Sequence, residues 1–290
     1  MNILKTAFLM TVMTLLLVWL GEAIAGPRGA WMFLIIAGVM NFVSYWFSDK
    51  MVLAMYRAKP IARAQAPELY TIVEGLAQKS NTPVPRVYRI PSDSPNAFAT
   101  GRDPKHAAVA VTEGIMKILD RNEMEAVLAH ELGHVHNRDI LIGSVVATLA
   151  GAISMISRAA MWGAMFGGGG GRRRGGNPIA LLVAMIVAPI AAVIVQLAIS
   201  RTREFAADKT GAQTCGHPLA LASALRKLER GTQAQPLENA TQATAHQFIV
   251  NPLRGQSLAG LFSTHPSTAD RIARLEDIAR SMGQLGGPLH

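Results

Sequence analysis

Two histidines and a glutamate stand close together in the segment HELGH, at His130, Glu131 and His134. Apolar residues recur around them at steps of three and four, which predicts a helix. On a helix His130 and His134 share one face, with their side chains about 6 Å apart. Two imidazoles so placed can grip a metal ion while a carboxylate held off the metal polarises the attacking water. The segment therefore predicts a metal site. The alternative, an ordinary polar stripe, fits poorly with the apolar flanks.

The element that carries these residues also has a predicted start. Asp120 is followed three residues later by Glu123, which is the spacing of a capping box at a helix N-terminus. His136 comes two residues after His134 and so faces another side of the helix. We expect His136 to be solvated rather than to bind the metal.

A catalytic zinc site needs a third protein ligand and an open position. The segment SRTREFAADKTGA supplies Glu204 and Asp208, which lie four residues apart and hence on one face of a predicted helix. Glu204 is our candidate third ligand. Asp208, one turn later, is a candidate to orient a zinc-bound imidazole. The alternative is a surface charge pair, for which neighbouring arginines and Lys209 supply counterions.

The composition places these elements in a membrane protein. The chain has 290 residues, 50% of them hydrophobic and only 16% charged, with a mean hydropathy of +0.25. Those values are too apolar for a soluble enzyme of this size. A cleaved signal peptide is an alternative for the first apolar stretch, but a second span follows within a few residues and favours an anchored hairpin. Four apolar stretches are the expected spans: residues 6–21, 29–48, 140–157 and 177–200. The third continues past Arg158 toward Phe166, and an arginine inside a span is costly unless it reaches the interface or finds a partner.

The predicted fold is a mainly α integral membrane protein with four transmembrane helices in two hairpins and a zincin-like α+β catalytic domain with a small sheet. Residues 107–111 predict an edge strand that binds extended substrate, or equally a buried structural strand. Residues 86–90 predict another strand, and helices are expected at 68–79, 218–228 and 267–279. The domains expected are a first hairpin at 1–49, the first catalytic part at 50–139, a second hairpin at 140–200 and the second catalytic part at 201–290.

Charge bears on orientation and partners. Most basic residues next to the apolar stretches fall on one side, which predicts that both termini and the catalytic domain face the cytoplasm. The run at 172–174 conflicts with this assignment and leaves open a second hairpin that is shallow or inserts late. A net charge of +9 suggests nucleic acid, but no nucleic-acid motif occurs, and basic residues beside spans suit anionic lipid. Cys215 is the single cysteine, so no intrachain disulfide can form.

The motifs HELGH and EFAAD, the two apolar hairpins and the segment STHPSTADRI near the C-terminus together resemble the HtpX-type bacterial membrane zinc metalloproteases, gluzincins related to the CAAX prenyl endopeptidases. The resemblance covers essentially the whole chain. It implies one zinc ion bound by His130, His134 and Glu204, with Glu131 as general base and Asp208 supporting a ligand.

The resemblance also implies roles for three further residues. His265 and Arg271 match positions expected to stabilise the transition state or to order the site, and Asn96 in SPNAFATG matches a residue of the substrate cleft. From the residues alone, His265 lies in a loop before a helix, where it could donate to an oxyanion or belong to the helix surface. Arg271 could equally pair with a neighbouring acidic residue such as Asp270 or Glu276.

The function so predicted is zinc-dependent hydrolysis of peptide bonds by metal-activated water, next to the cytoplasmic face of a bacterial inner membrane. The resemblance implies quality control of misfolded membrane proteins, so the expected partners are polypeptide substrates and the lipid bilayer. Two alternatives are a processing protease for prenylated or otherwise defined substrates and a non-proteolytic zinc-carrying membrane scaffold. The general base Glu131, which a scaffold would not need, disfavours the scaffold.

Overall fold

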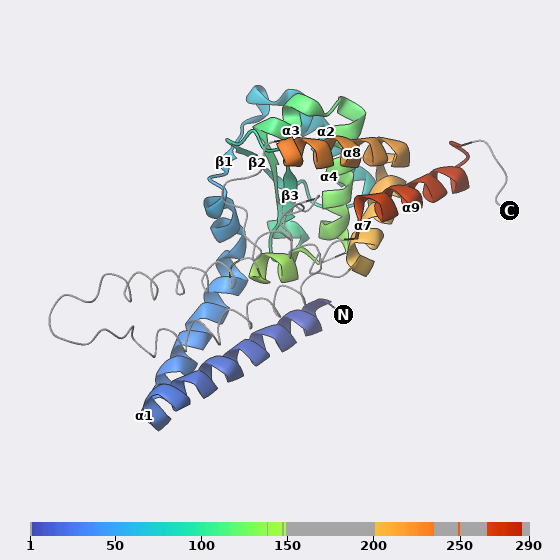
Figure 1. Ribbon diagram of the computed structural model, residues 1–290. Helices are drawn as coiled ribbons and strands as arrows, with labels where there is room; N and C mark the ends of the chain where they lie inside the picture. The colour runs from blue at the N-terminus through green and yellow to red at the C-terminus, as the bar shows by residue number, and fades with distance from the viewer. Residues whose placement is uncertain are drawn as a thin grey trace.

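The computed structural model describes residues 2–137, 139–146, 148, 201–234, 249 and 266–285 (Figure 1). This part of the chain is mainly helical, with one small mixed sheet. A long helical hairpin at the N-terminus projects from a body in which the sheet lies on one side of a central helix, α4 (Arg121–His136), and the C-terminal helices lie on the other. The coarse prediction of an α-rich protein with a small sheet is confirmed.

The hairpin is formed by α1 (Asn2–Met55), whose two limbs meet at a break where Ala25 and Gly26 leave helical geometry. Gly26 has φ +61°, a left-handed value that suits glycine, and it stands in the turn predicted at residues 26–28. Asn41 donates from Nδ2 to Oγ1 of Thr14, 2.8 Å away on the other limb. The prediction of two helices joined at this turn is confirmed.

One limb of this hairpin is suited to a bilayer by its length and composition. Residues Ala25–Met55 form an apolar helix of 31 residues with a mean hydropathy of 1.6, and Leu4–Trp19 forms a shorter apolar helix. Large apolar side chains on the limbs are exposed, among them Phe8, Trp31 and Ile35. The helix runs six residues beyond the predicted boundary at 49. The second hairpin lies almost wholly outside the described residues, although 140–146 are helical.

The sheet has the order β1-β2-β4-β3, formed by β1 (Lys59–Pro60), β2 (Arg86–Ile90), β4 (Ala108–Thr112) and β3 (Ala97–Thr100). β4 runs parallel to β2 and antiparallel to β3. All five residues of β4 are buried. Of the two alternatives for residues 107–111, the edge strand is therefore wrong and the buried structural strand is confirmed, because β4 has a neighbour on each side. The two edge strands are β1 and β3, neither of which was predicted, and β3 lies within the turn-rich segment between the two predicted strands.

The helices pack the sheet against a shared apolar core. The central helix α4 contacts β3, α2 (Pro67–Lys79), α7 (Arg201–Cys215) and α8 (Pro218–Ala234), while α9 (Thr268–Ser281) packs on α7 and α8. The short α3 (Glu113–Ile118) follows β4 directly. The core includes fully buried residues from α2, β4, α4, α8 and α9, such as Leu76, Val109, Leu128, Leu225 and Leu275. Each predicted helix at 68–79, 218–228 and 267–279 is confirmed, with α8 extending to Ala234.

Polar and aromatic contacts join the hairpin to the sheet. Arg86 in β2 donates to Oδ2 of Asp49 in α1 at 2.6 Å, and the Arg102 guanidinium lies 4.9 Å from the ring centre of Trp46. Val52 of α1 and Tyr56, which directly follows this helix, share a small core cluster with Phe98 of β3. The hairpin is thus anchored to the interior strand β2 and to β3, the strand that borders the candidate site.

Candidate metal centre

The helix that carries HELGH begins at the predicted cap. The side chain of Asp120 accepts from the Glu123 backbone nitrogen at 2.9 Å, and the Glu123 side chain accepts from the Asp120 backbone nitrogen at 2.9 Å, so both halves of the capping box are present. α4 then runs through the core, where His130 and Glu131 are buried. His136 is exposed on another face, as expected. The cap fixes the register that places the two histidines toward α7.

α7 approaches α4 closely enough to bring the third candidate ligand to them. A Cβ atom at Gly211 would lie 2.7 Å from the backbone nitrogen of His130, and one at Gly133 would lie 3.1 Å from the carbonyl oxygen of Ala207. A side chain at position 211 would clash with the backbone of α4, and one at position 133 would fit only if its neighbour shifted. The contact places Glu204 and Asp208, both buried on α7, against the histidine face of α4.

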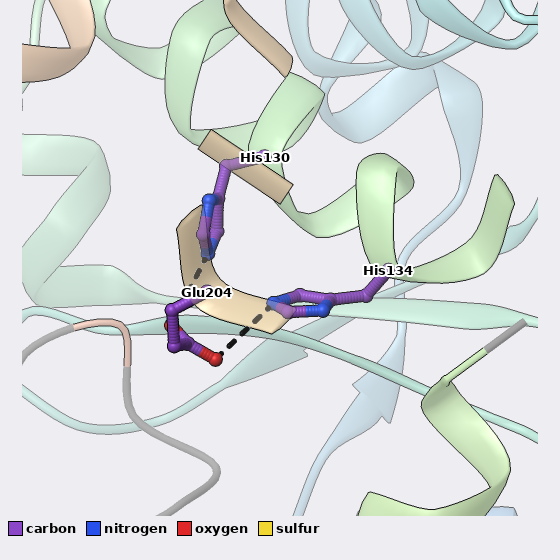
Figure 2. Close-up of side chains that lie close together, drawn as sticks. All are labelled: His130, His134 and Glu204. Atoms are coloured by element: carbon purple, nitrogen blue, oxygen red, sulfur yellow. Dashed lines mark ion pairs between the residues drawn. The ribbon is translucent and has the colours of Figure 1, made fainter. Parts of the chain in front are cut away.

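Ligand atoms of His130, His134 and Glu204 all lie within 4.8 Å of one another (Figure 2). The Nε2 atom of His130 is 3.8 Å from Oε2 of Glu204, and Nε2 of His134 is 3.7 Å from Oε1. The two imidazole rings are nearly perpendicular, with centres 4.8 Å apart. Two imidazole nitrogens and a carboxylate oxygen converging on one point form the donor set of a catalytic zinc site, so these side chains fit the ion that the sequence predicts.

Glu131 lies beside this group and is held by the edge strand. Its Oε2 atom accepts a hydrogen bond from the backbone nitrogen of Ala99 in β3 at 2.9 Å. Burial, the largest influence, raises the pKa of the Glu131 carboxyl group, against the lowering effects of His130 and His134. The carboxylate is therefore positioned next to the strand that an extended peptide could join.

His130 is supported by a buried pair on α7 and α9. Its Nδ1 atom lies 2.9 Å from Oδ1 of Asp208. Arg271 donates to both carboxylate oxygens of Asp208, at 2.6 and 2.9 Å, and to the carbonyl oxygen of Ile249 at 2.7 Å. The side chains of Asp208 and Arg271 are each 2% exposed. The surface alternatives considered for these two residues are thereby excluded, since Arg271 pairs with Asp208 rather than with Asp270 or Glu276.

The buried arginine also sets the protonation of this pair. Burial by itself would raise the pKa of the Asp208 carboxyl group, but Arg271 and His130 hold that pKa below its ordinary value. The pKa of Arg271 is raised by the same partnership, although burial opposes the charge. Asp208 is therefore an anion at neutral pH and accepts from the ring nitrogen of His130.

His134 has a different carboxylate, which the sequence analysis missed. Its Nδ1 atom lies 3.1 Å from Oδ1 and 3.2 Å from Oδ2 of Asp139, and Asp139 is buried. Burial alone would lower the pKa of His134, but Asp139, with Glu204 and Glu131, raises it to about 10. A detectable clue was present, because a charged residue stands directly before the apolar stretch that starts at Ile140.

Two of the remaining predicted residues have different outcomes. Asn96 is 2% exposed, its backbone pairs with Thr112, and its Oδ1 atom accepts from the backbone nitrogen of Ile249 at 3.3 Å. Asn96 lies just before β3, the strand that contains Ala99, the hydrogen-bond partner of Glu131. Its side chain therefore connects β3 to Ile249, whose carbonyl oxygen accepts from Arg271. His265 lies outside the described residues, and its role stays a prediction.

A family comparison agrees with the geometry. The model of Peptidase family M48 matches residues 63–279. The chain belongs to this family, and it is a metallopeptidase. A relative named "Protease HtpX homolog" from Syntrophotalea carbinolica is 56% identical over 96% of this chain and 99% of its own length. Relatives of the same name from Syntrophobacter fumaroxidans and Thermococcus kodakarensis are each 52% identical, over 94% and 97% of this chain and 98% and 97% of their own. The predicted resemblance to the HtpX-type proteases is confirmed.

A solved structure shares the fold. The crystal structure of S. mikatae Ste24p matches with a TM-score of 0.51 and 20% sequence identity, over 95% of this chain and 65% of that longer chain. Together with the apolar N-terminal hairpin and the HtpX relatives, the comparison supports a membrane metalloprotease.

Proposed function

We propose that this protein is a zinc-dependent membrane endopeptidase in which His130, His134 and Glu204 bind one zinc ion. The observation that carries the proposal is the convergence of these three side chains, with ligand atoms within 4.8 Å of one another, beside the buried carboxylate of Glu131. A zinc ion held there would lower the pKa of a bound water molecule and polarise the scissile carbonyl group.

Glu131 serves as the general base in this proposal. It accepts a proton from the attacking water and returns that proton to the leaving amine, so no covalent intermediate is needed. The raised pKa of its carboxyl group suits the proton return, because a more basic carboxylate holds the proton until the amine leaves. The hydrogen bond from Ala99 keeps one oxygen oriented while the other remains available.

The edge strand β3 replaces residues 107–111 as the proposed substrate strand. β3 pairs with β4 on one side, and in an antiparallel ladder alternate residues direct their backbone groups to the other side. Ala99 directs its N–H group to Glu131, so a peptide added along β3 would run past the catalytic carboxylate. An extended peptide bound this way is read through its backbone, which suits unfolded substrates of many sequences.

The proposal also places the catalytic domain relative to the membrane. We infer four spans, with the catalytic domain at the cytoplasmic face of a bacterial inner membrane and misfolded membrane proteins as substrates. His134 lies six residues before the apolar stretch that begins at 140, and Glu204 lies four residues after the one that ends at 200. The zinc ion should therefore lie within roughly 10 Å of the membrane surface. A substrate with a membrane anchor should be cut faster than its detached soluble loop, and equal rates would refute this placement.

The test of the central proposal pairs zinc content with proteolysis. Detergent-purified wild type and Glu131→Gln are measured for bound zinc and for cleavage of casein. We expect about one zinc per chain in both and a loss of cleavage by a factor of about 10² to 10⁴ in the variant, the contribution of a general base. The control is Glu123→Gln, because Glu123 is also a buried glutamate of α4 but caps the start of the helix. This variant shows what the loss of a buried carboxylate on this helix does by itself.

Other outcomes separate the alternatives. Zinc in both proteins with cleavage of casein in neither, but cleavage of a defined peptide by the wild type, would favour a processing protease of narrow specificity. Zinc in neither protein would refute the ligand assignment. Equal cleavage by wild type and Glu131→Gln would refute the role of Glu131.

A further inference from the structure

Asp139 lies where α4 has ended and the chain turns toward the second hairpin. Its backbone nitrogen donates to the carbonyl oxygen of His134 at 3.1 Å, and its two carboxylate oxygens lie 3.1 and 3.2 Å from Nδ1 of the same residue. The backbone and the side chain of Asp139 therefore both contact His134. The Asp139 side chain is 2% exposed, so this contact is not a chance surface pairing.

The contact determines which nitrogen of His134 faces the metal site. With Nδ1 occupied by a carboxylate, the proton of a neutral imidazole resides on Nδ1, and Nε2 presents its lone pair. Nε2 is the atom that lies 3.7 Å from Oε1 of Glu204. The ring is thus oriented for ligation by a residue outside the ligand set.

We propose that Asp139 is a positioning residue that holds His134 in the tautomer and orientation required to bind zinc. The inference rests on the proposed zinc site. It gives the centre two carboxylate supports, one for each imidazole, since Asp208 makes the corresponding contact with His130. It also makes the start of the second hairpin part of the metal centre.

The surroundings connect this support to the substrate strand. Ser144, in the helix that follows Asp139, has its Oγ atom 2.8 Å from Oγ1 of Thr100 and accepts from the backbone nitrogen of Gly101 at 3.1 Å. The same short helix therefore contacts His134 at its start and the end of β3 one to two turns later. A shift of this helix would move a ligand and the substrate strand together.

A purely structural role for Asp139 is the competing explanation, because an aspartate at the start of a helix can act as an N-cap. Asparagine caps a helix as well as aspartate does, whereas alanine does not. Asp139→Asn therefore keeps the cap and replaces only the anionic acceptor of the imidazole, and Asp139→Ala removes both. A cap role predicts that only alanine has an effect, and only on stability.

The experiment measures zinc affinity rather than turnover. Full-length protein in detergent is stripped of metal and titrated with zinc against a chromophoric chelator, and the cobalt-substituted protein gives a visible spectrum that reports ligand geometry. After correction for the proton that zinc displaces from His134, we expect Asp139→Ala to bind zinc about 10 to 100 times more weakly than wild type. Asp139→Asn should fall between the two and show an altered cobalt spectrum.

The chain offers a matched control in Asp103. Its carboxylate lies 2.8 Å from Nδ1 of His106, an exposed pair of the same chemistry away from the ligands. Asp103→Asn should leave zinc affinity and the cobalt spectrum unchanged.

Two results would overturn the proposal. One is a folded Asp139→Ala protein whose zinc affinity is within about twofold of wild type. The other, decisive if Asp139→Ala does not fold, is an Asp139→Asn protein with wild-type affinity and spectrum. His134→Ala separates failure of this proposal from failure of the zinc site. If His134→Ala also binds zinc normally, the ligand assignment is wrong. If His134→Ala loses zinc and the Asp139 variants do not, the ligand assignment stands and only the role proposed for Asp139 is wrong.

Discussion

His130 and His134 belong to one helix but are supported in different ways. His130 is 1% exposed, and its support comes from Asp208 on α7 and Arg271 on α9, far away in the sequence. His134 is 18% exposed, and its support, Asp139, follows within the same stretch of chain. The support of His130 therefore requires α4, α7 and α9 to be assembled. The support of His134 comes from a residue close to it in the sequence, next to the second hairpin. The first should govern stability, and the second should govern how the metal is held and exchanged.

The largest effect is expected on the His130 side. Arg271→Ala would leave Asp208 buried without its cation, which typically costs about 3–5 kcal/mol in the free energy of unfolding. Chemical unfolding of the metal-free protein measures the cost. The control is Arg226→Ala, which removes an exposed ion pair between α8 and α9 and should cost at most about 1 kcal/mol. Similar costs for both variants would break the distinction between the two sides.

The next effect concerns pH on the His134 side. The pKa of His134 is raised to about 10, so in the metal-free protein at neutral pH both of its ring nitrogens carry a proton. Zinc must displace the second of these protons, on Nε2, in order to bind. Zinc affinity should therefore rise with pH, by about tenfold per unit between pH 7 and 9. The sign for the metal-free fold is opposite: the stability that the raised pKa contributes is complete below about pH 6.5 and is lost as the pH rises through about 10.

Calorimetric titration checks the pH prediction. Performed at pH 8 in buffers of different ionisation enthalpy, it should report release of about one proton per zinc from this residue. An affinity that does not change between pH 7 and 9 would contradict the protonated state of His134.

A smaller effect is expected from the contact between α4 and α7. Gly211→Ala places a Cβ atom 2.7 Å from the His130 backbone, so we expect a loss of about 1–3 kcal/mol in the free energy of unfolding, with weaker zinc binding. Gly75→Ala is the matched control, because nothing lies within 4 Å of a Cβ at that position in α2. There alanine should stabilise the helix by about 0.5–1 kcal/mol. If both variants behave alike, close helix packing does not position Glu204.

The smallest effect tests the far end of α4. Asp120→Ala removes one half of the capping box and should cost about 1 kcal/mol in stability. Zinc affinity should be unchanged, because the cap lies at the opposite end of the helix from His134. A weakened zinc affinity would show that support of the ligands extends along the whole helix, and the contrast between the two histidines would have to be restated.

Sequence patterns predicted the parts of the fold that depend on neighbours along the chain. The capping box at Asp120, the helix that carries His130 and His134 and the apolar period of α2, α8 and α9 are local features, and each is confirmed. The break at Gly26 was predicted for the same reason, since a glycine followed directly by a proline favours a turn.

Features set by distant pairing were predicted less well. β3 is short, and its turn-forming neighbours hide it, so only its pairing with β4 shows that it is a strand and that β4 is interior. The partner of Arg271 is Asp208, across the fold, which no spacing could select over the acidic residues on its own helix. Asp139 was missed because its role depends on where the chain turns after α4 rather than on a helical period.

The order of the ligands along the chain has a consequence for the newly made protein. The whole segment 140–200 separates His134 from Glu204, and Arg271 follows later still. A nascent or prematurely ended chain that stops before residue 201 would thus carry two imidazoles without the carboxylate that completes the site. Under the proposed ligand assignment such a fragment would lack protease activity, so proteolysis would begin only when synthesis is nearly finished.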